Sequence, residues 1–343
     1  MNKKILSMTI ACAIMVSMFC TSMAASAAEV INKSVKAELT AQPVKYRDPM
    51  YFKADHIPYG DVLYSVYDSE ISIDGFADGV DTVEIPNEIN GLPVTSINVY
   101  YESANKVSKL IIPESVTEIS FLHGLHELSE IEVDENNPNF SSLDGVLFNK
   151  NKEVIRFYPA ARKDSTYSIP NSVKIIGEDA FFNCKNLTGV TIPYGVQFIR
   201  DYAFAACTNL SDIHIPYSVI SIDEGAFQDC ESINEFAISS KIVAIDDYTF
   251  LGCSSLSKVY MPQSTIIEYL AFEDDIAFIE IDDLGDIDSD SEITSADALL
   301  ALRYSVKLES FTEKQQILAN VDGDSEITSA DSLIILRQSV GLE

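Results

Sequence analysis

Apolar and polar positions repeat along the middle of the chain with a period of 23 residues. Proline, cysteine and phenylalanine return at this spacing, and apolar residues keep the same phases in every unit. Such a period indicates that each unit buries its apolar face against its neighbours rather than in one closed core. The pattern therefore predicts a solenoid. The repeated positions are Pro170, Pro193, Pro216, Ser239 and Pro262, then Cys184, Cys207, Cys230 and Cys253, then Phe181, Phe204, Phe227 and Phe250.

Each unit has a short stretch of alternating character just before its proline. In the second unit, Val190 and Ile192 flank Thr191. Because alternate side chains of a strand point to opposite faces, this stretch predicts a strand with Val190 and Ile192 inward and Thr191 outward. Pro193 ends the strand, and the sequence AFFNC at 180–184 predicts a compact turn or short helix on the opposite side of the coil.

These units resemble the BspA-like leucine-rich repeats of bacterial surface proteins, which read I-P-x-x-V-x-x-I-x-x-x-A-F-x-x-C-x-x-L. The resemblance covers 167–281, and the segments 83–97 and 136–160 are similar to that family's entry repeat and long insertion. It implies an α/β leucine-rich-repeat solenoid with one short strand per coil over 83–282, after an N-terminal cap region at 29–82. A fold of this kind implies no particular activity.

The outward-facing strand positions form the surface that such a solenoid offers to a ligand. Their character is mixed, and the chain has no tryptophan to stack against a sugar. Tyr194 and Tyr217 occupy equivalent positions after their prolines, which leaves open either a sugar-stacking pair or the interpretation we favour, ordinary surface packing. We therefore expect an unknown protein or glycan as the solenoid ligand. The outward row is Ser168, Thr191, His214, Ala237 and Tyr260.

The first 28 residues have the character of a secretory signal peptide. Lys3 and Lys4 precede an apolar stretch at 5–20, and a run of small residues follows. Cleavage after Ala27 or Ala28 would start the mature chain near 29. A retained membrane anchor is the weaker interpretation because the apolar stretch is too short to span a bilayer. A lipoprotein is weaker still, because Phe19 precedes the cysteine. We expect a secreted protein with no membrane insertion of the mature chain.

The balance of charge is strongly acidic. With 23 basic and 53 acidic residues, the formal net charge is −30. Nucleic acids and anionic lipids require a basic surface, so neither is expected as a partner. Calcium suits this composition better.

Four of the six cysteines follow the predicted signal peptide, and all four lie in the repeat register. An even number in an exported protein is compatible with disulfides. However, equivalent residues of stacked coils point the same way, whereas a disulfide needs converging side chains. We therefore favour buried free thiols that fill the core as small apolar groups.

The octapeptide DSEITSAD occurs twice, at 290–297 and at 324–331. Each copy ends a segment that matches the calcium-binding loop of an EF-hand, whose oxygen ligands occupy positions 1, 3, 5, 7, 9 and 12. We therefore predict two calcium ions, with the second site weaker because Asn320 offers an amide instead of a carboxylate. The predicted ligands are Asp286, Asp288, Asp290, Glu292, Thr294 and Asp297 in the first loop, and Asn320, Asp322, Asp324, Glu326, Thr328 and Asp331 in the second.

The segment 284–343 resembles a type I dockerin, a small all-α module of two loop–helix halves. Thr294 and Thr328 precede apolar runs at capping-box spacing from Asp297 and Asp331, which predicts a helix after each loop. A third helix is expected at 311–320. The resemblance implies calcium binding and docking onto a cohesin domain of a scaffoldin, as in a cellulosome-type complex.

The same resemblance implies which residues contact the cohesin. They fall at equivalent places in both halves, so we expect that either half can present the same surface after a half-turn, giving two binding orientations. The implied contacts are Ser295, Ala296, Leu302 and Arg303 in the first half, and Ser329, Ala330, Leu336 and Arg337 in the second. A 60-residue module without cysteine is marginal by itself. Calcium removal is therefore expected to unfold it and abolish cohesin binding while the solenoid stays folded.

Catalytic motifs are absent from the sequence. His123 and His126 lie three residues apart without forming an HExxH motif, and no phosphate loop or nucleophile elbow occurs. We predict a non-catalytic binding component. Two alternatives stay open: an accessory protein or enzyme of polysaccharide degradation, and a cell-surface adhesin.

Overall fold

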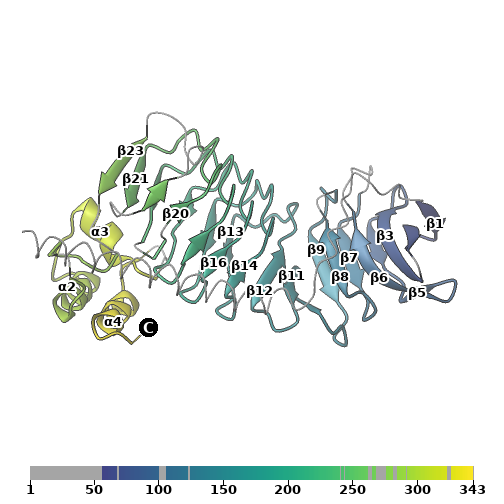
Figure 1. Cartoon of the computed structure of the whole chain (residues 1–343), viewed down its shortest axis with the longest axis horizontal. Helices are drawn as coiled ribbons and strands as arrows, with labels where there is room; N and C mark the ends of the chain where they lie inside the picture. Colours follow the sequence, from purple (N-terminus) through teal and green to yellow (C-terminus); the bar gives the residue numbers. More distant parts are fainter. Residues whose placement is uncertain are drawn as a thin grey trace, which may run out of the picture. The chain divides into compact units, whose positions relative to one another are not determined.

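In the computed structural model, the residues from Ala54 onward form one compact unit. The described residues are 56–67, 69–99, 106–122, 124–239, 241–242, 244–261, 265–267, 276–280, 284–290, 292–322 and 326–342. The predicted signal peptide and the first part of the predicted cap region lie outside these ranges. Figure 1 shows strands that follow one another in stacked coils, with helices near the C-terminus.

The first strands form an antiparallel meander that changes to parallel pairing. β1 (Ile57–Tyr59), β2 (Val62–Tyr67) and β3 (Glu70–Phe76) are antiparallel neighbours, and β3 then pairs in parallel with β6 (Leu92–Asn98). β8 (Glu118–Phe121) pairs in parallel with β6, whereas β5 (Glu88–Ile89) pairs with it antiparallel. A second parallel sheet contains β4 (Thr82–Glu84), β7 (Lys109–Ile112) and β9 (Glu130–Val133). The meander lies within the segment predicted as the N-terminal cap.

The long insertion forms a second antiparallel meander. β10 (Phe140–Leu143), β11 (Val146–Asn149) and β12 (Val154–Phe157) pair in sequence, and β12 then pairs in parallel with β14 (Ile175–Ile176). The insertion thereby provides the starting edge on which the regular coils stack.

The regular coils carry two short strands each, where the sequence predicted one. One strand is the predicted one before the proline, in β13 (Thr166–Ser168), β15 (Gly189–Thr191), β17 (Asp212–Ile213), β19 (Glu235–Ala237), β21 (Lys258–Met261) and β23 (Ala277–Glu280). The other follows it, in β14, β16 (Phe198–Ile199), β18 (Ser221–Ile222), β20 (Ala244–Ile245) and β22 (Ile266–Ile267). Pairing partners such as Thr166 and Gly189 are 23 residues apart, as the period requires.

Turns fill the side of the coil opposite the predicted strands, and their phenylalanines form a continuous stack. The rings of Phe181, Phe204, Phe227 and Phe250 lie with successive centroids 4.9, 5.3 and 5.6 Å apart. Successive ring planes differ by 13°, 4° and 7°, so the rings are nearly parallel. A fixed phase in the sequence thus becomes a column of buried aromatic side chains.

The four repeat cysteines are free and buried, which confirms the favoured interpretation. Each thiol has a polar partner in the coil before it: the Sγ of Cys207, Cys230 and Cys253 donates to the carbonyl oxygen of the phenylalanine 26 residues earlier, at 3.0, 3.1 and 3.1 Å. Burial raises the pKa of the Cys184 and Cys230 thiols well above its usual range. These groups are therefore neutral donors inside the core.

The C-terminal module contains α2 (Ser295–Ser305), α3 (Glu313–Ala319) and α4 (Ser329–Ser339). All three predicted helices are present, and Thr294, Thr312 and Thr328 are their N-caps, each within a capping box. α2 and α4 contact each other, with Ser332 Oγ donating to the Ala298 carbonyl oxygen at 2.7 Å. Among the described residues, no helix combines the length and apolar character needed to cross a membrane.

Candidate functional site

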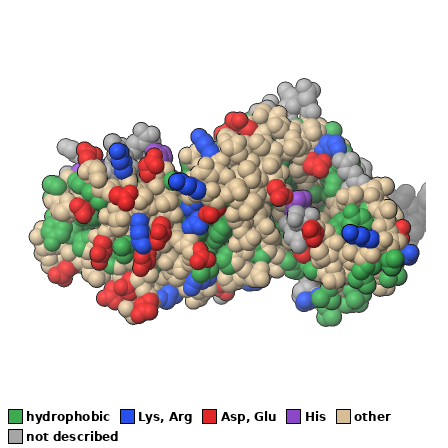
Figure 2. Space-filling view, turned by 180° about the vertical axis from the view of Figure 1, so that it is seen from behind, with side chains coloured by type: hydrophobic (Ala, Val, Ile, Leu, Met, Phe, Trp, Pro, Cys, Tyr) green, Lys and Arg blue, Asp and Glu red, His purple; other side chains and the backbone are tan. Residues whose placement is uncertain are grey.

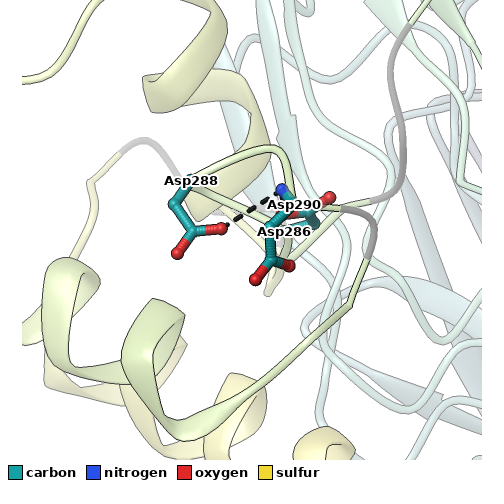
Figure 3. Close-up of side chains that lie close together, drawn as sticks. All are labelled: Asp286, Asp288 and Asp290. Atoms are coloured by element: carbon teal, nitrogen blue, oxygen red, sulfur yellow. Dashed lines mark hydrogen bonds between the residues drawn. The ribbon is translucent and has the colours of Figure 1, made fainter.

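Three carboxylates of the loop before α2 converge on one point. One oxygen from each of Asp286, Asp288 and Asp290 lies within 4.8 Å of the other two (Figure 3). Asp286 is buried, whereas Asp288 and Asp290 are exposed. The Asp290 amide donates to Asp286 Oδ1 at 3.1 Å and to Asp288 Oδ1 at 3.2 Å, so the loop coils around its own carboxylates.

The carboxylate at position 12 closes this loop onto its helix. Asp297 is fully buried, and its Oδ1 accepts from the amides of Ile287 at 2.8 Å and Asp288 at 3.2 Å. Its Oδ2 accepts from the Thr294 amide at 2.9 Å. One side chain therefore caps α2 and holds the two ends of the loop together.

The second loop repeats this closure around Asp331. The buried Asp331 accepts from the amides of Val321 at 3.0 Å, Asp322 at 3.3 Å and Thr328 at 2.8 Å. Asn320 ends α3 as its C-cap, which places the first predicted ligand at the helix end. Asp324 lies outside the described residues, and Glu326 is exposed.

The electrostatics of the first loop favour a cation. Partial desolvation and the neighbouring charges of Asp297 and Asp290 raise the pKa of Asp288. A bound cation would remove this repulsion between carboxylates. The donors are all oxygen atoms, and calcium takes six to eight oxygen ligands. The residues present therefore fit calcium.

A second feature of the module is an exposed apolar surface on α2 and α4. The predicted contact residues Ser295, Ala296, Leu302, Arg303, Ser329, Ala330, Leu336 and Arg337 are all exposed. The two predicted leucines have similar exposed fractions, 40% for Leu302 and 42% for Leu336. Arg303 forms an ion pair with Glu309 at 3.4 Å, and Arg337 Nε donates to the Leu342 carbonyl at 3.2 Å. Each arginine head is thereby held by a contact just beyond the C-terminal end of its own helix.

Sequence reasoning missed four further apolar residues of this surface. They are Leu299 on α2 and its C-cap Val306, and Leu333 on α4 and its C-cap Val340. Each is more than half exposed. Their spacing in the sequence could have identified them, because they lie three or four residues from Leu302 and Leu336 and therefore on the same helix face. Figure 2 shows hydrophobic side chains gathered at the surface of this end of the chain.

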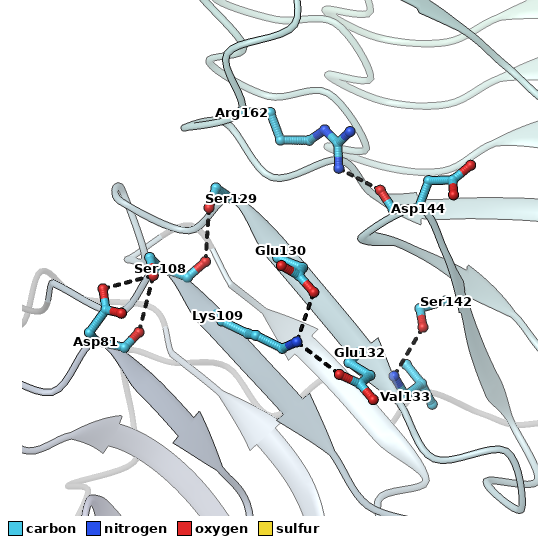
Figure 4. A network of polar contacts seen from close by, with 10 residues as sticks. All are labelled: Asp81, Ser108, Lys109, Ser129, Glu130, Glu132, Val133, Ser142, Asp144 and Arg162. Atoms are coloured by element: carbon cyan, nitrogen blue, oxygen red, sulfur yellow. Dashed lines mark hydrogen bonds and ion pairs between the residues drawn. The ribbon is translucent and has the colours of Figure 1, made fainter.

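The outer face of the first coils carries a polar network instead. Lys109 Nζ lies 2.8 Å from Glu130 Oε1 and 2.9 Å from Glu132 Oε2, and Ser108 Oγ donates to Asp81 Oδ1 at 2.8 Å (Figure 4). Hydrogen bonds to Glu130 and then Glu132 raise the pKa of Lys109. These contacts join residues of neighbouring coils, so the network stabilises the stack.

The other candidate residues of the solenoid do not assemble into a site. Tyr194 is 37% exposed, but Tyr217 is only 8% exposed because it is buried in a cluster with the C-terminal module. The two tyrosines therefore do not form one open sugar platform, and that alternative is wrong. His126 is exposed, and His123 lies outside the described residues.

Comparisons with known proteins agree with both halves of this description. Six copies of the BspA type leucine rich repeat region match residues 157–278, and the dockerin type I domain matches 284–338. A solved leucine-rich repeat protein from Eubacterium ventriosum is 32% identical with a TM-score of 0.52, over 59% of this chain and 54% of that chain.

A leucine rich cell surface protein from Faecalibacterium prausnitzii is 27% identical with a TM-score of 0.47, over 59% of this chain and 59% of that chain. The match thus spans little more than half the length of either solved chain, and no curated protein matches. Dockerin type I domains bind calcium and cohesins, and neither region is a catalytic domain. This chain is a BspA-type leucine-rich-repeat protein with a C-terminal type I dockerin domain.

Proposed function

We propose that this protein is a secreted, non-catalytic component that docks through its dockerin onto a cohesin of a scaffoldin in a cellulosome-type complex. Its leucine-rich repeats then present a surface to a protein or glycan ligand. The observation that carries the proposal is the exposed surface of α2 and α4, where each helix presents apolar side chains and one arginine that is held by a contact of its own. Exposed apolar patches mark interaction sites, and arginine is enriched among the residues that contribute most to binding.

The proposal includes two calcium ions, one in each loop. Support comes from the converging carboxylates of the first loop and from the matching closure by Asp297 and Asp331. Calcium would hold each loop in the form that starts its helix, and so position α2 and α4 for the cohesin. The ligand sets are those predicted from the two loop sequences.

The proposal also includes two cohesin-binding orientations. Equivalent residues of the two halves are 34 positions apart. The pairs Leu299 and Leu333, at 55% and 57% exposed, and Leu302 and Leu336, at 40% and 42%, are matched. A half-turn of the dockerin would therefore offer a cohesin a nearly identical surface.

The test is binding of the full chain to a panel of type I cohesins, with calcium and with chelator. We expect binding to at least one cohesin only with calcium. Changing Leu302 and Arg303 to alanine, or Leu336 and Arg337 to alanine, should each leave affinity largely intact, and all four changes together should abolish it. Loss of binding from one pair alone would indicate a single orientation. No binding to any cohesin would contradict the proposed docking.

Secretion and the absence of catalysis need separate tests. Mass spectrometry of the exported protein should find an N-terminus near residue 29. Hydrolysis of plant polysaccharides by the purified chain should be undetectable, and measurable hydrolysis would favour the enzyme alternative.

A further inference from the structure

The outward row of strand residues changes character towards the end of the solenoid. Ser168, Thr191 and His214 are polar and exposed. Ala237, Tyr260 and Ile279 continue the row as cross-strand neighbours of β19, β21 and β23, and all three are apolar. Tyr260 is 4% exposed although its position points away from the solenoid core.

The helical module covers this apolar part of the row. A single hydrophobic cluster joins Tyr217 and Tyr260 to buried residues of the dockerin, with Ala237 and Ile279 packed against it. The dockerin members include residues of α3 and of the segment that follows it, namely Leu318, Ala319 and Val321. The Lys241 ammonium lies 4.5 Å from the Tyr217 ring centroid, a cation–π contact on the same ring.

A backbone hydrogen bond fixes this contact at the second calcium loop. The Tyr217 amide donates to the Val321 carbonyl oxygen at 3.1 Å. Val321 is the second residue of the loop, between the predicted ligands Asn320 and Asp322, and its own amide donates to Asp331 at 3.0 Å. The closure of the second loop and the contact with the solenoid therefore share one residue.

The surface proposed for cohesin binding lies elsewhere on the module. Leu302, Arg303, Leu336 and Arg337 stay exposed while Tyr217 and Tyr260 are covered. The dockerin thus has two separate faces, one towards its own solenoid and one free.

We infer that α3 and the second calcium loop form an intramolecular docking face for the last coils of the solenoid, so that calcium in the second loop and the order of these coils stabilise each other. By thermodynamic linkage, the free energy by which the contact stabilises the closed loop equals the free energy by which the closed loop stabilises the contact. The inference rests on the proposed calcium binding, but the contact itself does not. The bond from Tyr217 reaches the second loop, so the coupling is expected at the second site.

The test compares two lysine substitutions in the same row of the full chain. Ala237→Lys places a charge in the covered part of the row, and Thr191→Lys places it in the exposed part. Hydrogen exchange of the Tyr217 amide reports the contact directly, and the Tyr202 amide, which donates to the Glu224 carbonyl at 2.9 Å between coils, is the internal control. Circular dichroism checks that both variants fold, and Tyr260→Ser is the second variant should Ala237→Lys not fold.

We expect Ala237→Lys to raise exchange at Tyr217 by about fivefold or more, a typical size for coupling between sites. Calorimetric titration with calcium should show a matching loss of affinity at one of two sites. Cohesin binding and exchange at Tyr202 should stay as in the unaltered chain. In Thr191→Lys, exchange at Tyr217 and both calcium affinities should also stay unchanged. In the unaltered chain, chelation should raise exchange at Tyr217.

Equal exchange at Tyr217 in the two lysine variants would overturn the docking face. Raised exchange with both calcium affinities unchanged would overturn the coupling while leaving the contact in place. Failure of the unaltered chain to bind calcium would overturn the proposed function, and raised exchange at Tyr217 in Ala237→Lys would then still support the docking face.

Discussion

The solenoid and the dockerin stabilise themselves by different means. All of the largest fully buried side chains among the described residues lie in the solenoid and the strands that precede it, including Tyr158, Phe148 and the stacked phenylalanines. The buried apolar side chains of the helical module are aliphatic and smaller, such as Leu318, Ala301 and Ile335. Repeated stacking therefore gives the solenoid a core of its own, whereas the dockerin combines a small core with carboxylates that need a cation. Removing one kind of support should affect one region far more than the other.

Calcium removal should have the largest effect. A ligand at 1,000 times its dissociation constant stabilises a protein by about 4 kcal/mol per site, and two sites would act on one small module. We expect chelation to abolish the protection of α2 and α4 amides from hydrogen exchange. The coils between β13 and β18 should stay protected. Unchanged protection of α2 and α4 would contradict the dependence of the module on calcium.

The second prediction weakens the core of the solenoid instead of the dockerin, by removing one ring from the column of stacked phenylalanines. Phe227 is fully buried between Phe204 and Phe250, so Phe227→Ala should lower the free energy of unfolding of the solenoid by about 3–5 kcal/mol. Phe182 is 37% exposed and is the matched control, for which we expect a change within about 0.5 kcal/mol. Thermal unfolding followed by near-ultraviolet circular dichroism measures both. Equal losses in the two variants would mean that the column does not carry the stability.

A smaller effect is expected where a turn approaches its neighbour. Gly225 has a φ of +60°, and an added Cβ would lie 2.3 Å from the Tyr202 ring. Gly225→Ala should therefore destabilise the solenoid by about 1–2 kcal/mol, the sum of a left-handed backbone and a displaced ring. Gly79 has a φ of +80°, but an added Cβ there would meet no atom within 4 Å. Gly79→Ala should therefore show only the cost of the left-handed backbone. Urea unfolding of the two variants separates these contributions. Equal losses in the free energy of unfolding would mean that the clash with the Tyr202 ring contributes nothing.

A change of pH should alter the stability of the solenoid and that of the dockerin in opposite directions. Burial, followed by the charges of neighbouring carboxylates, raises the pKa of Asp179 to about 7 and that of Asp201 to about 6. Because the folded pKa exceeds the unfolded value of about 3.9, this contribution is fully present below pH 4 and is lost as pH rises through 6 and 7. After screening we expect about 1 kcal/mol more solenoid stability at pH 5 than at pH 8.

The dockerin should show the opposite trend, because calcium binds deprotonated carboxylates. Asp179→Asn should reduce the pH dependence of the solenoid. Chemical unfolding from pH 4 to pH 8 measures the solenoid, and calcium affinity over the same range measures the dockerin. A solenoid that gains stability with rising pH would contradict the assignment to Asp179.

Much of the site was predictable because its ligands are close in sequence. The EF-hand spacing placed Asp286, Asp288 and Asp290 together, and the capping boxes fixed the start of each helix, since both depend on local geometry. The spread of the exposed surface to Leu299 and Val306 was not predicted. An apolar residue on a helix has the same spacing whether it faces a core or solvent, so its exposure depends on what packs against it.

The sequence by itself determined the repeat, the two loops, the three helices and the free thiols, because each follows from spacing along the chain or between identical coils. Only the tertiary structure decided that each coil has a second strand and that Tyr217 and Tyr260 are covered by the dockerin while Tyr194 is not. A period fixes which residues are equivalent between neighbours. It cannot fix which of these equivalent residues a non-repeating module will cover, because that depends on contacts between segments far apart in the chain.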